Sequence, residues 1–210
     1  MGQNRWPSRL LATDLACVRG GRTVLSGLTF AVGAGEALLV SGPNGAGKSS
    51  LLRMVAGLVR LADGRLELAD GDGEATLGEQ AHYLGHQDAL KPSLTVAENL
   101  WFWVRYLGGG DDDAAANAAL DAVGLGSIAG LPAAYLSAGQ RRRLSIARLI
   151  AVARPLWLLD EPTSALDAAA QAMLAELMRK HLSAGGMILA ATHGPIGLDG
   201  TKELKLGAQR

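Results

Sequence analysis

Nearly continuous apolar runs separated by polar turns dominate both ends of the chain. Residues 37–42 (ALLVSG), 155–160 (PLWLLD) and 186–192 (GMILAAT) are such runs, which is typical of parallel strands covered on both faces. Between the last two, residues 168–181 repeat apolar positions at helical spacing. Strand, helix and strand in this order predict an α/β fold with a parallel core sheet.

Two shorter segments, residues 28–32 (LTFAV) and 64–68 (GRLEL), alternate apolar with less apolar residues. This alternation predicts two further strands, which we expect to be antiparallel and to flank the first motif. The run at 37–42 leads into a helical pattern. Its expected apolar face consists of Leu51, Leu52, Val55 and Leu58.

The middle of the chain, from about residue 88 to 153, has a mostly helical pattern instead. Residues 95–107 predict one helix, residues 111–123 predict a second with a solvated acidic start, and the basic stretch at 136–149 predicts a third. The sequence therefore predicts a single domain over residues 1–210, with a helical subdomain inserted in the α/β core.

Composition narrows the class of protein. The chain has 210 residues, 49% of them apolar and 19% charged, and a net charge of +0, so it is globular and lacks the basic excess of a nucleic-acid partner. The single cysteine, Cys17, predicts no internal disulfide and a reducing compartment. No apolar run approaches the roughly 18 residues of a membrane-spanning helix, so any membrane role needs a separate partner.

The segment GPNGAGKSS fits the phosphate-binding pattern G-x-x-x-x-G-K-[ST]. Its glycines let successive N–H groups face a phosphate, and the helix that follows adds its dipole. Lys48 can reach the β- and γ-phosphates, and the Ser49 hydroxyl can bind Mg²⁺. The predicted nucleotide-binding residues here are Gly42, Pro43, Asn44, Gly45, Ala46, Gly47, Lys48, Ser49 and Ser50.

The segment LWLLDEP supplies acids at the end of a predicted buried strand. Asp160 can hold Mg²⁺ beside the phosphate loop. Glu161 points differently because side chains alternate along a strand, and it can orient or deprotonate an attacking water. Together with the phosphate loop, these acids predict ATP and Mg²⁺ as ligands.

A second helix start suited to an anion follows at LSAGQRRRLSIARL. Its first residues, Ser137, Ala138, Gly139 and Gln140, are small or polar and admit close approach. Three arginines, at positions 141–143, add positive potential, and we expect at least one of them only to face solvent. One small chain thus carries two places for phosphate.

These motifs, in this order and followed by ATH at 191–193, resemble the ATP-binding-cassette (ABC) ATPases over nearly the whole chain. The resemblance implies a head-to-tail homodimer in which the signature helix of one copy closes over the ATP of the other. It further implies that Ser137 and the N–H of Gly139 face the γ-phosphate. The family usually has glycine where this chain has Ala138, whose methyl group tightens the approach.

The resemblance assigns further positions individually. It implies that Gln87 contacts Mg²⁺ and the attacking water, and that His193 contacts the γ-phosphate. It also places Asp167 in the loop that couples the two sites of a dimer. The family usually stacks an aromatic residue on adenine, whereas this chain has Arg19 near that position, whose guanidinium plane could stack instead.

An aromatic cluster lies in the predicted helix at 95–107. Successive positions on a helix cannot all face one core. Two interpretations stay open: some of these side chains dock a membrane partner, or all pack inside the helical subdomain. The residues are Trp101, Phe102, Trp103 and Tyr106.

Within the ABC family, LSAGQRRR, GHQDALKPSLTVAENL and the early end after ATH resemble the ATP-binding subunits of cytochrome c maturation, or haem exporter, systems. This closer resemblance implies an integral membrane permease, a haem-handling membrane subunit and a peripheral position on the cytoplasmic face of the inner membrane. For His82 and His86, structural or solvent-facing roles are favoured over haem ligation.

Other functions stay open from the sequence. A cassette that drives transport of a lipid, ion or drug would carry the same motifs. A soluble cassette acting on ribosomes would normally have two cassettes, and a DNA-repair cassette would carry a long coiled coil. A P-loop kinase would not need the signature, and a nucleotide-binding protein without turnover would not need Glu161.

Overall fold

The computed structural model describes residues 6–110 and 113–207. Contacts divide the chain into two compact units. The first, here called the core unit, comprises the described residues of Met1–Gly85, Arg154–Pro162 and Met178–Arg210. The second, here called the helical unit, comprises the described residues of His86–Ala153 and Thr163–Leu177. The helix α5 (Ala168–Ser183) contributes residues to both units.

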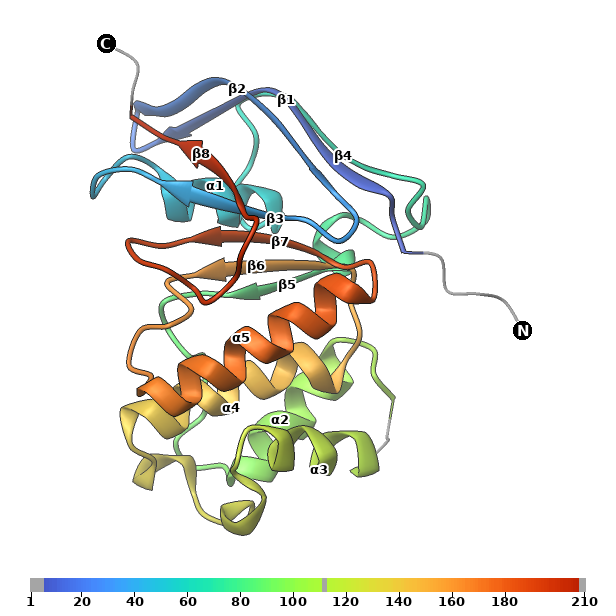
Figure 1. The fold of residues 1–210 in the computed structure, drawn as a ribbon, viewed down its shortest axis with the longest axis vertical. Helices are drawn as coiled ribbons and strands as arrows, with labels where there is room; N and C mark the ends of the chain where they lie inside the picture. The colour runs from blue at the N-terminus through green and yellow to red at the C-terminus, as the bar shows by residue number, and fades with distance from the viewer. Residues whose placement is uncertain (1–5, 111–112, 208–210) are drawn as a thin grey trace. The chain divides into compact units, whose positions relative to one another are not determined.

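A five-stranded parallel sheet lies in the core unit, with the strand order β5-β6-β7-β3-β8 (Figure 1). Its middle strands are the apolar runs of the sequence, and β6 and β7 are buried at every position. Continuous burial follows from a sheet that is covered on both faces. The strands are β3 (Ala37–Ser41), β5 (Ala81–Leu84), β6 (Leu156–Asp160), β7 (Met187–Ala191) and β8 (Lys202–Lys205).

A three-stranded antiparallel sheet, ordered β2-β1-β4, completes the strands of the described core unit. Its long hairpin pairs β1 (Arg9–Arg19) with β2 (Arg22–Gly33), and β4 (Asp63–Ala69) pairs with the other edge of β1. The β1–β2 pairing shifts register three times between Ala12 and Val18. Such irregularities bend a strand and increase its local twist.

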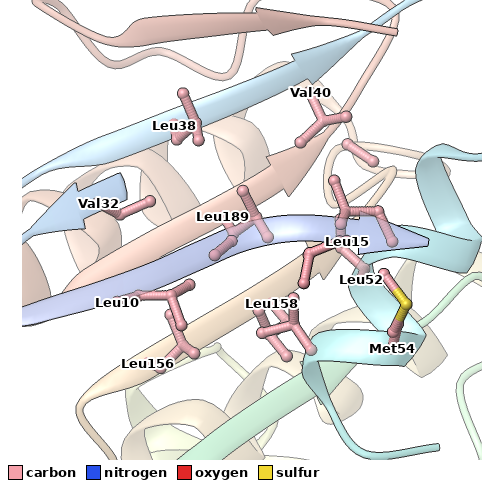
Figure 2. Packing of buried hydrophobic residues seen from close by; sticks show 14 of the residues in the cluster. Leu10, Leu15, Val32, Leu38, Val40, Leu52, Met54, Leu156, Leu158 and Leu189 are labelled. Atoms are coloured by element: carbon pink, nitrogen blue, oxygen red, sulfur yellow. The ribbon is translucent and has the colours of Figure 1, made fainter. Parts of the chain in front are cut away.

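The apolar core of this unit lies where β1 and β2 pack against β3, β6, β7 and the helix α1 (Lys48–Val55) (Figure 2). Leu10 and Leu15 of β1 face Leu156 and Leu158 of β6, and all four are fully buried. Truncating such a leucine to alanine costs about 2–5 kcal/mol of unfolding free energy. The phosphate loop, which connects β3 to α1, is therefore anchored at both ends in this core.

The helical unit is built on α2 (Val96–Tyr106), α3 (Asp113–Ala122) and α4 (Ala138–Ala151), which contact one another (Figure 1). Thr95 caps α2 through a capping box with Glu98, in which each side chain accepts a hydrogen bond from the other residue's backbone N–H. Such caps stabilise a helix by roughly 1 kcal/mol. They fix where α2 begins relative to the loop that precedes it.

The α/β fold class predicted from the sequence is confirmed, with two sheets and helices of the expected kinds. One expectation is wrong: α1 ends at Val55, and Leu58 lies beyond it with 64% of its surface exposed. Glycine at position 57, with a φ angle of +72°, follows the end of that helix, as is common after helix C-termini. The first two acids of the predicted acidic helix start, at 111–112, lie outside the described residues.

A buried histidine lies between two tryptophans at the far end of α5 in the core unit. The His181 ring stacks on Trp157, with centroids 4.0 Å apart and planes at 12°, and a tilted Trp6 ring lies 5.4 Å away. Its Nε2 lies 3.3 Å from the carbonyl oxygen of Met187. Burial lowers the pKa of His181 to about 4 and outweighs the opposing effect of backbone carbonyls.

This shift predicts a loss of stability in mild acid. An unfolded chain takes up a proton on His181 near its ordinary pKa of 6.5, whereas the folded chain does so only near 4. The contribution of His181 to the free energy of unfolding is therefore complete above pH 6.5. It is lost as the pH falls toward 4, and the loss is about 3 kcal/mol at most. Denaturant unfolding at several pH values should show a weaker acid dependence in His181→Phe than in the wild type. An identical dependence in both would contradict this assignment.

Candidate functional site

The phosphate loop spans the turn between β3 and α1 and depends on glycines at two points. Gly42 has a φ angle of +143°, and a Cβ there would come 2.5 Å from the carbonyl oxygen of Leu206. Gly47 has a φ angle of +97°, and a Cβ there would come 2.8 Å from Cγ1 of Val24. Both the backbone conformation and the lack of space require glycine at these positions.

Lys48 folds back over the loop that precedes it. Its Nζ donates hydrogen bonds to the carbonyl oxygens of Gly42 at 2.7 Å and Pro43 at 3.1 Å. The same Nζ lies 3.2 Å from Nε2 of His193. The ammonium group is thus held at the mouth of the loop, where it can reach a bound phosphate.

Ser49 joins the loop to the carboxyl end of β6. Its hydroxyl donates a hydrogen bond of 3.0 Å to Oδ1 of Asp160, which is itself buried. These residues are separated by 111 positions in the sequence. The carboxylate predicted to lie beside the phosphate loop does lie there.

Glu161 occupies a strained position directly after β6. Its φ angle is +48°, in the left-handed region that non-glycine residues rarely adopt, and its N–H donates to the carbonyl oxygen of Ala191 at 2.8 Å. Strain of this kind is concentrated at functional sites. Glu161 Oε1 lies 3.7 Å from Nε2 of His193, which follows β7. The geometry therefore brings Lys48, Glu161 and His193 together.

Tyr83 and Arg53 also belong to this group of residues, although no sequence motif pointed to either of them. The Tyr83 hydroxyl donates to Oδ2 of Asp160 at 3.2 Å, and Arg53 Nε donates to the Tyr83 oxygen at 3.1 Å. Burial raises the pKa of Tyr83, so its hydroxyl retains the proton that it donates. The tyrosine and its carboxylate partner are 77 positions apart, and nothing in the local pattern around Tyr83 marks the contact.

The donor set at Ser49 and Asp160 suits magnesium. The described residues contain no group of three His, Cys, Asp or Glu side chains that could hold a metal alone. Magnesium in nucleotide sites is commonly bound through one or two protein oxygens, with substrate phosphates and waters completing its shell. A hydroxyl and a carboxylate oxygen 3.0 Å apart beside a phosphate loop fit that requirement.

The signature segment begins α4 in the helical unit. Ser137 caps the helix: its Oγ accepts from the Gln140 N–H at 3.2 Å, and Gln140 Oε1 accepts from the Ser137 N–H at 2.8 Å. The spacing S-x-x-Q could have revealed this box in the sequence. Ala138 is exposed at the first helical position. A Cβ on Gly139 would come 3.1 Å from the carbonyl oxygen of Ala165.

Each of the three arginines that follow makes a side-chain contact within the helical unit. This corrects the expectation that at least one would only face solvent. Arg141 donates to the Leu136 carbonyl at 2.5 Å, and Arg143 donates to the Val123 carbonyl at 2.9 Å. Arg142 is buried, and its Nη1 lies 3.4 Å from Oδ1 of Asp88. Carbonyl oxygens left free at segment ends attract these guanidinium groups.

The segment after Gln87 is fastened to the signature helix. Ser145 Oγ donates to the Asp88 carbonyl at 2.9 Å, and Arg142 pairs with the Asp88 carboxylate. The indole N–H of Trp103 donates to the Ala89 carbonyl at 3.2 Å. Gln87 itself is exposed in this segment of the helical unit, and its contact with Mg²⁺ stays a prediction.

The sequence left two interpretations open for the aromatic cluster on α2, and each of them describes part of the cluster. Trp101 and Trp103 are half-buried, and the buried guanidinium of Arg148 lies 4.4 Å above the Trp103 ring. Phe102 and Tyr106 are 56% and 71% exposed, and their rings stack on each other. Large exposed apolar patches mark sites where a partner binds, and this pair is the exposed part of the cluster.

The remaining predicted positions are Asp167 and Arg19. Asp167 precedes α5, and its Oδ1 accepts a hydrogen bond from the Ala170 N–H at 2.8 Å. Arg19 is exposed at the end of β1, opposite Arg22. Two residues further along β2, Val24 approaches the phosphate loop at Gly47. The hairpin end that carries Arg19 thus belongs to the same unit as the phosphate loop.

The site combines a phosphate loop, a magnesium-type donor pair, a strained acid and a histidine, and the family comparison agrees with it. The family model described as "ABC transporter" matches residues 25–164. The chain therefore belongs to the ABC transporter family, as its sequence resemblance predicted, and it carries an ATP-binding domain of that family.

Relatives of high identity cover nearly the whole chain. A protein of Rhodopseudomonas palustris (strain BisB18) is 65% identical over 95% of this chain and 98% of its own length, and its name is "Cytochrome c biogenesis ATP-binding export protein CcmA". A protein of the same name from Nitrobacter winogradskyi is 62% identical with the same coverage. The predicted resemblance to cytochrome c maturation proteins is thereby confirmed.

Solved structures agree on the fold. The structure described as "Structure of ATP binding subunit of ABC transporter" superposes with a TM-score of 0.83 at 26% identity, covering 94% of this chain and 85% of that one. A bacterial Atm1-family ABC exporter with ATP bound superposes with a TM-score of 0.80 at 22% identity, covering 95% of this chain and 37% of that one. Within the described residues, every helix is too short or too polar to cross a membrane.

Proposed function

We propose that this chain is the ATP-binding and ATP-hydrolysing subunit of an export system that handles haem in cytochrome c biogenesis. The observation that carries the proposal is that Lys48 lies beside His193, and Ser49 beside Asp160, in the core unit of a chain that is 65% identical to a cytochrome c biogenesis export protein. As an ABC cassette, the chain acts as a single nucleotide-binding domain with an inserted helical part.

Different residues of the core unit have different roles in ATP hydrolysis. Loop N–H groups and Lys48 bind and orient the phosphates of ATP. Ser49 and Asp160 would hold Mg²⁺, which would neutralise charge on the phosphate oxygens. Glu161 orients the attacking water and accepts its proton, and His193 contacts the γ-phosphate beside Lys48.

The helical unit supplies the second phosphate contact to another copy of the chain. Two chains arranged head to tail would place Ser137 and the Gly139 N–H against the γ-phosphate held by the partner's phosphate loop. The helix N-terminus favours that charge, and the exposure of Ala138 leaves the approach open. Gln87 would add a contact to Mg²⁺ and the attacking water.

The membrane partners are an integral permease and a haem-handling subunit, which place the chain at the cytoplasmic face of the inner membrane. The relatives' name contains the words "ATP-binding export protein", which support a role in an export system. We assign the permease contact to the exposed pair Phe102 and Tyr106, which offers an apolar surface without a covering element in the described helical unit.

Arg19 is expected to stack on adenine. We predict that Arg19→Ala raises the dissociation constant for ATP several-fold, because the guanidinium plane and its cation–π attraction are lost. Arg22→Ala, an exposed residue opposite Arg19 in the hairpin, is the matched control. Titration with a fluorescent ATP analogue measures both, and an unchanged constant in Arg19→Ala would remove this residue from the site.

Capture of the tagged chain from gently solubilised native membranes tests the assignment of partners. We expect a small multi-span permease and a haem-binding protein, the latter visible through its Soret absorption band. The double variant Phe102→Ser with Tyr106→Ser should lose the permease, whereas Leu58→Ser, an equally exposed apolar site in the core unit, should keep it. Recovery of a lipid, ion or drug permease, or of a wholly soluble chain, would contradict the haem assignment.

A further inference from the structure

A chain of hydrogen bonds runs from α1 through β5 to the acid at the end of β6. Arg53 Nε donates to the oxygen of Tyr83 at 3.1 Å, and the Tyr83 hydroxyl lies 3.2 Å from Oδ2 of Asp160. On its other oxygen, Asp160 accepts from the Ser49 hydroxyl at 3.0 Å. Two elements of the core unit, α1 and β5, therefore converge on the carboxylate at the end of β6.

The direction of these hydrogen bonds is determined by the chemistry of the groups. A guanidinium can only donate, so the phenol oxygen of Tyr83 must accept from Arg53. The phenol proton is then available to the Asp160 carboxylate, which can only accept when ionised. This series of hydrogen bonds is thus polarised toward Asp160, and each hydrogen bond strengthens the next.

The fold places the tyrosine ring for this contact. In the parallel pairing of β5 with β6, Tyr83 lies opposite Leu158, two residues before Asp160 on the same face of the strand. A Cβ on Gly85 would come 2.9 Å from Cε1 of Tyr83. Glycine at that position leaves room for the ring where it lies.

We propose that Tyr83 is a positioning residue for the metal-binding carboxylate: it holds Asp160 so that Oδ1 faces Ser49, while Arg53 holds Tyr83. The inference rests on the proposed function, in which Ser49 and Asp160 hold Mg²⁺. A carboxylate without this contact can rotate and present either oxygen to the site. Loss of such an outer partner typically weakens metal binding by about 10–100-fold.

Tyr83→Phe tests the proposal because it removes only the hydroxyl and keeps the ring. The probe is Mn²⁺ in the presence of a non-hydrolysable ATP analogue, followed by electron paramagnetic resonance. We expect the half-saturating Mn²⁺ concentration to rise about 10-fold. Binding of a fluorescent ATP analogue in EDTA should not change, because the phosphate loop is intact. Tyr135→Phe, which alters a tyrosine that is 75% exposed, is the matched control.

Arg53→Met supplies a second, independent variant at an exposed position. It should raise the half-saturating Mn²⁺ concentration in the wild type and have no effect in Tyr83→Phe, because both act through one hydroxyl. Unchanged Mn²⁺ binding in Tyr83→Phe, or equal effects of Arg53→Met in both backgrounds, would overturn the inference. Failure of the wild type to bind the nucleotide would instead overturn the proposed function.

Discussion

Glu161→Gln is expected to abolish ATP hydrolysis and to leave ATP binding intact. The amide fits the space of the carboxylate but cannot accept a proton from the attacking water, and a general base contributes at least about 100-fold to such a step. The phosphate loop and Lys48 do not depend on this side chain, since Lys48 is held by the Gly42 and Pro43 carbonyls. Steady-state phosphate release and ATP titration measure the two effects separately.

The same variant should accumulate as an ATP-bound dimer. Unhydrolysed ATP continues to join the two copies through its γ-phosphate, so gel filtration with ATP should show a dimer that the wild type shows only transiently. Glu74→Gln, an exposed acid in the loop after β4, should leave turnover and elution unchanged. Turnover that survives in Glu161→Gln would show that Glu161 is not the base.

Mixing two inactive variants is expected to restore hydrolysis, because each site takes its phosphate loop from one chain and its signature from the other. Lys48→Ala disables the phosphate loop. Ala138→Asp places a negative charge where the partner's γ-phosphate would lie, while an acid in the first turn favours the helix itself. Each variant alone should lose activity, and Ala138→Asp should still bind ATP at its own loop.

In an equal mixture, half of the dimers combine the two variants and hold one intact site, so activity should recover to about a quarter of the wild-type value. Lys48→Ala mixed with Glu161→Gln is the control: both changes lie in the core unit, so no intact site can form. Absence of recovery in the first mixture, with dimers present, would contradict the head-to-tail arrangement.

The sequence predicted the parts of this molecule that depend on neighbouring residues. The phosphate loop is one contiguous segment. The spacing of its glycines, Lys48 and Ser49 was therefore enough to predict their roles. Asp160 and Glu161 follow a short apolar run that is typical of a buried strand. The central parallel strands were predicted for the same reason, since continuous burial leaves a continuous apolar signal.

Three strands carried no such signal. In β1 the register shifts around Leu15 and Cys17 break the alternation that marks a strand. The strand β8 (Lys202–Lys205) is short, polar and largely exposed at a sheet edge, and β5 (Ala81–Leu84) has four residues. Their pairing is decided by neighbours distant in sequence and not by their own composition.

Side-chain contacts that no sequence motif marks could not be predicted either. The hydrogen bond from Tyr83 to Asp160 and the pairing of Arg142 with Asp88 each join segments more than 50 residues apart. Arginines 141–143 were predicted to add positive potential, with at least one of them only facing solvent, yet each finds a different acceptor in the helical unit. Which charged side chains form contacts within the protein is therefore determined by the fold.

The most direct test of the account is genetic replacement. In a Rhodopseudomonas palustris strain from which the 65% identical relative has been deleted, this chain should restore c-type cytochromes with covalently attached haem, measured by haem staining of separated proteins. Lys48→Ala, expressed at the same level, should restore none. If the wild-type chain is present and hydrolyses ATP but c-type cytochromes stay absent, while the deleted relative restores them, the proposed role in cytochrome c biogenesis is wrong.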